Sequence, residues 1–133
     1  MRTFTHRIPF AWIIAFVFVL LVGFALATEG TVEIPAIKAD LGPCSADFTV
    51  TDAAGKPVYN AKIKATIRHG IMSKRKLDLE VGTNSDGKAR FVGLPAKVKR
   101  PFEFTIQYGS QTASKVHDPS LECEAKFDIA LGK

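Results

Sequence analysis

Two cysteines carry the most evident chemistry in this sequence of 133 residues. Cys44 and Cys123 each begin an alternating run and share the parity of its apolar residues, so both thiols are predicted to face a core. In an exported protein, an even number of cysteines at matching strand positions favours a disulfide. Two buried thiols are the alternative, and a cytoplasmic domain would favour them. Neither cysteine has a second Cys or His at ligand spacing, which argues against a metal pair.

Three further side chains are of types that a soft metal accepts as ligands. His69 and Met72 form a His-x-x-Met pair, and His117 would complete a copper(I)-type set. Ordinary structural roles are the alternative: His69 would end a strand, and His117 would lie in the loop His117-Asp-Pro-Ser. We therefore expect no bound cofactor and keep a copper-type or other small-ligand site as the alternative function.

Six cationic side chains gather in two short segments between expected strands: Lys74, Arg75 and Lys76, then Lys97, Lys99 and Arg100. Such clusters could bind lipid head groups, an acidic polysaccharide or an acidic protein. Solvated loops that merely aid solubility are the alternative. The formal net charge of +5 falls to +3 when Arg2 and Arg7 are set aside. This modest excess lacks the basic stripe of a nucleic-acid binder, so we expect no nucleic-acid partner.

An uncharged run from Ile8 to Ala27 follows the two N-terminal arginines. As a helix it would cover about 30 Å, the hydrocarbon thickness of a bilayer. The sequence predicts a cytoplasmic basic segment at 1–7 and a transmembrane signal anchor at 8–27. A signal peptide cleaved after Ala27 is the alternative, since Ala25-Leu-Ala27 is similar to a cleavage site. Because the basic residues precede the apolar run, both interpretations place the remaining chain outside the cytoplasm, in a periplasmic or extracellular space.

The elements that would position these side chains are short strands. Residues 28–43 contain two prolines and two glycines without a sustained period, which predicts a linker. Residues 44–132 contain seven alternating runs divided by turn residues, at 44–51, 61–68, 77–81, 88–92, 102–108, 111–116 and 123–131. This pattern predicts an all-β, seven-stranded antiparallel sandwich of the prealbumin or immunoglobulin type. Its inward positions predict a core of Phe48, Val50, Ile63, Ile67, Leu79, Val81, Phe91, Phe104, Ile106, Phe127 and Ile129.

Two segments carry a family resemblance. FTVTDAAGKPVYNAKI contains Asp-x-x-Gly-x-Pro-Val, and VGTNSDGKARFVGLP supplies Thr83, Asp86, Gly87, Phe91 and the pair Leu94-Pro95. The chain from Cys44 to Leu131 thereby resembles the carboxypeptidase regulatory-like, prealbumin-like domains of secreted and membrane-anchored bacterial proteins. The matched residues specify turns and core positions, so the resemblance implies a fold and, for function, a scaffold, spacer or binding domain.

Transthyretin-like hydrolases share this architecture and raise the question of catalysis. Members of that group end in Tyr-Arg-Gly-Ser and have paired histidines, whereas this chain ends Ala130-Leu-Gly-Lys133. The sequence also has no Gly-x-Ser-x-Gly or His-Glu-x-x-His motif to supply a nucleophile with a base. We therefore predict a non-catalytic module, tethered to the membrane by its N-terminal helix, that interacts with an envelope protein or an anionic surface.

Overall fold

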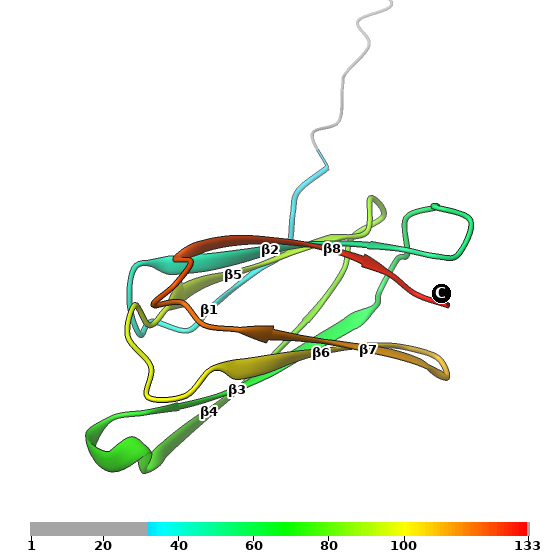
Figure 1. Ribbon diagram of the computed structural model, residues 1–133. Helices are drawn as coiled ribbons and strands as arrows, with labels where there is room; N and C mark the ends of the chain where they lie inside the picture. The colour runs from blue at the N-terminus through cyan, green and yellow to red at the C-terminus, as the bar shows by residue number, and fades with distance from the viewer. Residues whose placement is uncertain (1–31, 133) are drawn as a thin grey trace, which may run out of the picture. The chain divides into compact units, whose positions relative to one another are not determined.

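The computed structural model describes residues 32–132, which fold as two facing β-sheets (Figure 1). The predicted basic segment at 1–7 and the predicted helix at 8–27 lie outside the described residues. Within residues 32–132, no helix has the length and apolar character needed to span a bilayer. Residues Thr31–Lys133 form a compact unit.

Each sheet has four strands, in the orders β1-β5-β2-β8 and β4-β3-β6-β7. The strands are β1 (Ala36–Lys38), β2 (Cys44–Thr51), β3 (Lys62–His69), β4 (Arg75–Gly82), β5 (Lys88–Leu94), β6 (Phe102–Tyr108), β7 (Gln111–His117) and β8 (Glu124–Ala130). A single-turn 3-10 helix, η2 (Ile71–Ser73), forms the tip of the β3–β4 hairpin. The predicted all-β fold of two sheets is thus confirmed.

Two details of the predicted topology are wrong. An eighth strand, β1, lies inside the predicted linker and pairs with β5 in parallel, because three residues are too few to show an alternating pattern. The sandwich is also not purely antiparallel, since β2 and β8 run parallel over seven residue pairs, from Ser45–Glu124 to Thr51–Ala130. Turn residues in the sequence mark where strands end, but they do not specify which distant strand becomes a neighbour.

The core lies between the sheets and is rich in phenylalanine. Residues alternate between buried and outward positions along β2 and β3, as the period of two requires. Phe48, Phe91 and Phe104 are fully buried, and their ring centroids lie 4.8–5.8 Å apart. Of the eleven predicted core residues, Val81 and Phe127 are half-buried and the other nine are buried.

The turn residues in the two family-like segments are the ones that fix the connections. Asp52 accepts backbone hydrogen bonds from Ala54 and Lys56, at 2.9 and 3.0 Å. The buried Thr83 hydroxyl donates to the Val58 carbonyl at 2.6 Å and accepts from the Ala61 amide at 2.9 Å. Gly87 has a φ of +72°, and a Cβ there would lie 2.3 Å from the Val50 carbonyl oxygen, so only glycine fits.

Strand directions give the sandwich two distinct ends. One end, which we call the loop end, carries the β1–β2, β3–β4, β5–β6 and β7–β8 connections (Figure 1). The opposite end carries the other three connections and the end of β8. The first described residues also lie there, because Asn84 in the β4–β5 turn donates to the Glu33 carbonyl at 3.0 Å.

Candidate functional site

A disulfide closes the loop end. Cys44 and Cys123 are bonded, at a sequence separation of 79 and a Cα–Cα distance of 4.6 Å, which confirms the predicted pairing. Cys44 is fully buried at the start of β2, but Cys123 is exposed, so its predicted inward orientation is wrong. Cys123 lies in the bend before β8, where strand alternation does not apply. Its carbonyl accepts a hydrogen bond from the Ser45 amide at 2.8 Å, which extends the β2–β8 pairing to the disulfide.

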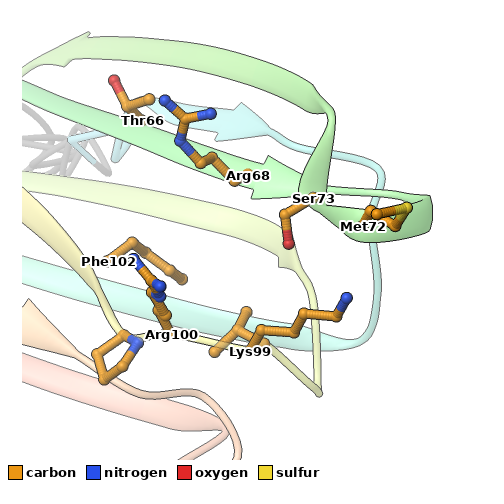
Figure 2. A pocket seen from close by; sticks show the side chains of 9 residues that line it. Thr66, Arg68, Met72, Ser73, Lys99, Arg100 and Phe102 are labelled. Carbon is orange, nitrogen blue, oxygen red and sulfur yellow. The ribbon is translucent and has the colours of Figure 1, made fainter.

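A pocket of about 600 Å³ lies between the β3–β4 hairpin and the β5–β6 loop, which carry the two basic segments. The β3–β4 hairpin contributes Arg68 and Met72, and the β5–β6 loop contributes Lys99 and Arg100 (Figure 2). Figure 2 shows Arg68 projecting from β3 on one side and Lys99 and Arg100 lying on the other. The full lining is Thr66, Arg68, Met72, Ser73, Val98, Lys99, Arg100, Pro101 and Phe102.

The pocket forms where two neighbouring strands diverge. Strands β3 and β6 pair from Lys62–Gln107 to Ala65–Phe104, and the paired register stops there. Beyond that point β3 pairs only with β4, and Pro101, which has no amide hydrogen to donate to a ladder, precedes the start of β6 at Phe102. Thr66 and Arg68 on one strand and Phe102 on the other thus line an opening instead of facing each other across a ladder.

Along the β3–β4 hairpin, charged residues that face each other carry opposite charges near one end and like charges near the loop end. Near the opposite end Lys64 faces Glu80, with 3.6 Å between Nζ and Oε2. At the loop end Arg68 faces Lys76 directly, and like charges directly across two strands are destabilising. The ion pair between Lys76 and Asp78 offsets part of this repulsion, and an anion bound near Arg68 would offset more of it.

Carboxylates lie beside the pocket but do not line it. Asp78 accepts a hydrogen bond from the Thr66 hydroxyl at 2.6 Å and forms an ion pair with Lys76 at 3.5 Å. The Thr66 hydrogen bond, together with Lys76, lowers the pKa of Asp78 below its ordinary value, so this carboxylate stays ionised at neutral pH. Glu103 on β6 follows the pocket residue Phe102 in the sequence, and it does not line the pocket either. Three cations and no carboxylate line the pocket itself, which suits an anionic group.

The three residues of the predicted copper-type site do not form one site. His117 is buried at 3% exposure among Phe102, Phe104 and Phe127, whereas Met72 is 69% exposed at the hairpin tip. His69 ends β3, as the alternative interpretation held, but His117 ends β7 instead of lying in a loop. Across residues 32–132, no three His, Cys, Asp or Glu side chains gather as a metal site.

Only part of the pocket lining was predicted from the sequence. Lys99 and Arg100 line it, while Lys74, Arg75, Lys76 and Lys97 are exposed around the loop end without lining it. Arg68, Thr66, Ser73 and Phe102 were missed as site residues. The alternating pattern of residues 61–68 places Arg68 and Thr66 on the outward face of the strand, and the divergence of β3 from β6 makes part of that face the wall of a pocket.

No family model matches this chain, and no curated protein matches it. Among solved structures, the chain is similar to the dioxygenase domain of a dioxygenase carbohydrate-binding protein fusion from Streptomyces sp. SirexAA-E. That match has 17% identity and a TM-score of 0.48, and it covers 78% of this chain and 94% of the other.

Two further structures are similar at the same level. One is 3-chlorocatechol 1,2-dioxygenase from Rhodococcus opacus, with 13% identity, a TM-score of 0.48, and coverage of 93% of this chain and 78% of that one. The other is catechol 1,2-dioxygenase from Acinetobacter sp., with 15% identity, a TM-score of 0.46, and coverage of 91% and 67%. These values are too low to assign this chain a fold family or an activity.

Proposed function

We propose that this chain is a non-catalytic, exported β-sandwich module, tethered by its N-terminal segment, that binds an anionic group at its loop end. The observation that carries the proposal is the convergence of Arg68, Lys99 and Arg100, from segments about 30 residues apart in sequence, on one pocket without a lining carboxylate. Cations that only aid solubility would not need to lie around a shared concavity.

The chemistry of the lining favours binding over catalysis. Thr66 and Ser73 are the hydroxyl side chains of the pocket, and no histidine, cysteine or carboxylate lines it to activate them. The Thr66 hydroxyl is moreover engaged as a donor to Asp78. The resemblance to carboxypeptidase regulatory-like domains also supports a scaffold or binding role. The disulfide supports an oxidising, extracytoplasmic location.

The direct test is a titration of the isotope-labelled domain, residues 31–133, with inorganic phosphate at low ionic strength, followed by NMR. The amide signals of Arg68, Lys99 and Arg100 should shift with saturation. The triple substitution Arg68→Glu, Lys99→Glu and Arg100→Glu should abolish these shifts.

The matched control reverses the same number of charges elsewhere. Lys56 and Lys88 lie at the opposite end, and Lys126 lies on β8 in the other sheet from β3 and β6. None of the three lines the pocket or forms an ion pair among the described residues. Their triple replacement by Glu should leave phosphate binding at the pocket in place. Equal loss in both variants would indicate a response to net charge alone and would overturn the proposed site.

A further inference from the structure

The tip of the β3–β4 hairpin displays two large apolar side chains. Ile71 is 88% exposed and Met72 is 69% exposed. Three of the four tip residues, Gly70, Met72 and Ser73, have φ values of +81°, +58° and +54°, respectively. A left-handed conformation is unfavourable for Met and Ser, and such residues cluster at functional positions. The tip therefore presents apolar side chains to the solvent in a turn conformation that Asn and Gly usually adopt.

Cations surround this apolar tip. Arg68 precedes it on the hairpin, Lys74, Arg75 and Lys76 follow it, and the facing β5–β6 loop adds Lys97, Lys99 and Arg100. Residues 67–77 and 95–101 contain no Asp or Glu. The side chain of Arg75 lies over the tip, since a Cβ at Gly70 would be 3.5 Å from its Cδ atom. Protruding apolar side chains within a ring of Lys and Arg match the interface of an anionic bilayer.

We propose that the loop end binds the surface of an anionic phospholipid bilayer. Ile71 and Met72 enter the interface between head groups and acyl chains, and Arg68, Lys99 and Arg100 hold a head-group phosphate in the pocket. Met72 belongs to the hairpin tip and also lines the pocket, so insertion and phosphate binding occur at adjoining surfaces. This inference rests on the proposed function and names the partner of the same site.

The form of this surface favours a bilayer over an acidic protein. Stable protein interfaces bury about 800 Å² per partner and are depleted in lysine. Within the basic segments 67–77 and 95–101, the large exposed apolar side chains are Ile71 and Met72 on a protruding tip, and four of the seven surrounding cations are lysines. Val116 and Leu121 add exposed apolar surface in β7 and the β7–β8 connection of the same end. A bilayer needs only a small apolar wedge, because each cation near the anionic surface adds to the attraction.

Residues 31–133 are suited to the test as an independent domain. They form a compact unit, and their buried core lies between Ala39 and Leu131. The chain has a single tryptophan, Trp12, outside this fragment, so Met72→Trp gives the fragment one fluorescent reporter at the tip. Tyr59→Trp is the matched control, since Tyr59 is 68% exposed and lies at the opposite end. A cooperative thermal melt establishes first that each variant folds.

The probes are vesicles of phosphatidylglycerol mixed with phosphatidylcholine, and vesicles of phosphatidylcholine alone. With anionic vesicles the Met72→Trp emission should shift to the blue and be quenched by brominated acyl chains, while Tyr59→Trp should show neither change. Ile71→Ser with Met72→Ser should lower the partition coefficient about 10-fold, whereas Tyr59→Ser with Tyr108→Ser should not. Reversing Lys74, Arg75 and Lys76 to Glu should lower it more than about 100-fold.

Unshifted Met72→Trp emission with anionic vesicles, or wild-type partitioning of the Ile71→Ser, Met72→Ser variant, would overturn the insertion. Phosphate binding at the pocket without vesicle binding would refute the bilayer and leave the proposed function standing. Binding of polyglutamate without vesicle binding would point to an acidic protein instead. If the wild-type fragment binds neither phosphate nor anionic vesicles, both proposals are wrong.

Discussion

At the scale of single residues, His117 combines burial with an unsatisfied polar atom. Its ring lies 5.6 Å from the ring centroids of Phe102 and Phe127, and its buried Nε2 has no hydrogen-bond partner within the described chain. Burial lowers the pKa of His117 below the ordinary value of 6.5, against the opposing effect of the Glu122 and Asp118 carboxylates. The protonated ring is therefore disfavoured in the folded protein.

This burial predicts a pH dependence of stability. Below about pH 6.5 the unfolded chain binds a proton at His117 that the folded domain does not bind, so the free energy of unfolding should fall as the pH is lowered through this range. His117→Phe should reduce this loss, because phenylalanine suits the aromatic surroundings and does not titrate. Urea unfolding of both proteins at pH 7.5 and pH 5.5 measures the difference. Equal losses in the two proteins would show that His117 does not cause it.

Sequence reasoning at this scale succeeded where a residue's role is local. The motif predicts Asp52 as a turn residue, and its carboxylate accepts hydrogen bonds from the Ala54 and Lys56 amides within the same turn. Sequence reasoning failed where the surroundings are set by distant segments. The burial of His117 depends on phenylalanines of β6 and β8, and the sequence around His117 does not indicate that these residues pack against it.

At the scale of elements, the parallel β2–β8 pair joins the beginning and the end of the domain. The disulfide lies at the start of this pair and closes a segment of 79 residues. On the chain-entropy model a loop of this length restricts the unfolded chain by about 4–5 kcal/mol, although measured effects are often smaller. Because a domain of this size has only about 5–15 kcal/mol of net stability, the bond is expected to be a major part of it.

Replacing both Cys44 and Cys123 by Ser should therefore lower the melting temperature of the domain well below that of the wild type. The mass of the wild-type protein after export should be lower by two hydrogens than that of its reduced form. Thermal unfolding and intact-mass spectrometry make the two measurements. Thiols that react with an alkylating reagent in the native exported protein would contradict the pairing.

The seven strands recognised from alternation appear in the structure with boundaries shifted by no more than two residues. Their pairing was not predictable in the same way, because an alternating run specifies a buried face and not a neighbour. The pocket was hidden for the same reason. Lys99 and Arg100 approach Arg68 only because β6 diverges from β3, and the two segments have no sequence relation.

At the scale of the whole molecule, the described chain begins at the end of the sandwich opposite the basic loops. Glu33 is hydrogen-bonded to Asn84 in the β4–β5 turn, and β3 and β4 extend from that end to the tip over eight residues each, about 25 Å. We therefore expect the loop end of a tethered domain to be accessible to a second surface.

Export is the first condition of this arrangement. The N-terminal arginines and the apolar run predict that Thr28 to Lys133 lies outside the cytoplasm. An alkaline phosphatase fusion at Lys133 should be active, and a reporter that fluoresces only in the cytoplasm should be dark at the same position. The reverse pattern would contradict export. A mature N-terminus at Thr28 would show that the domain is released instead of tethered.

The most direct test of the central claim, that the loop end is the working surface of a tethered module, uses the full chain. The protein is reconstituted in neutral phosphatidylcholine vesicles, and capture of labelled, protein-free vesicles containing phosphatidylglycerol is measured by fluorescence. We expect capture that weakens with salt, is lost on reversal of Lys74, Arg75 and Lys76 to Glu, and persists on reversal of Lys56, Lys88 and Lys126. Absence of capture by the wild type, or equal capture by both variants, would contradict the claim.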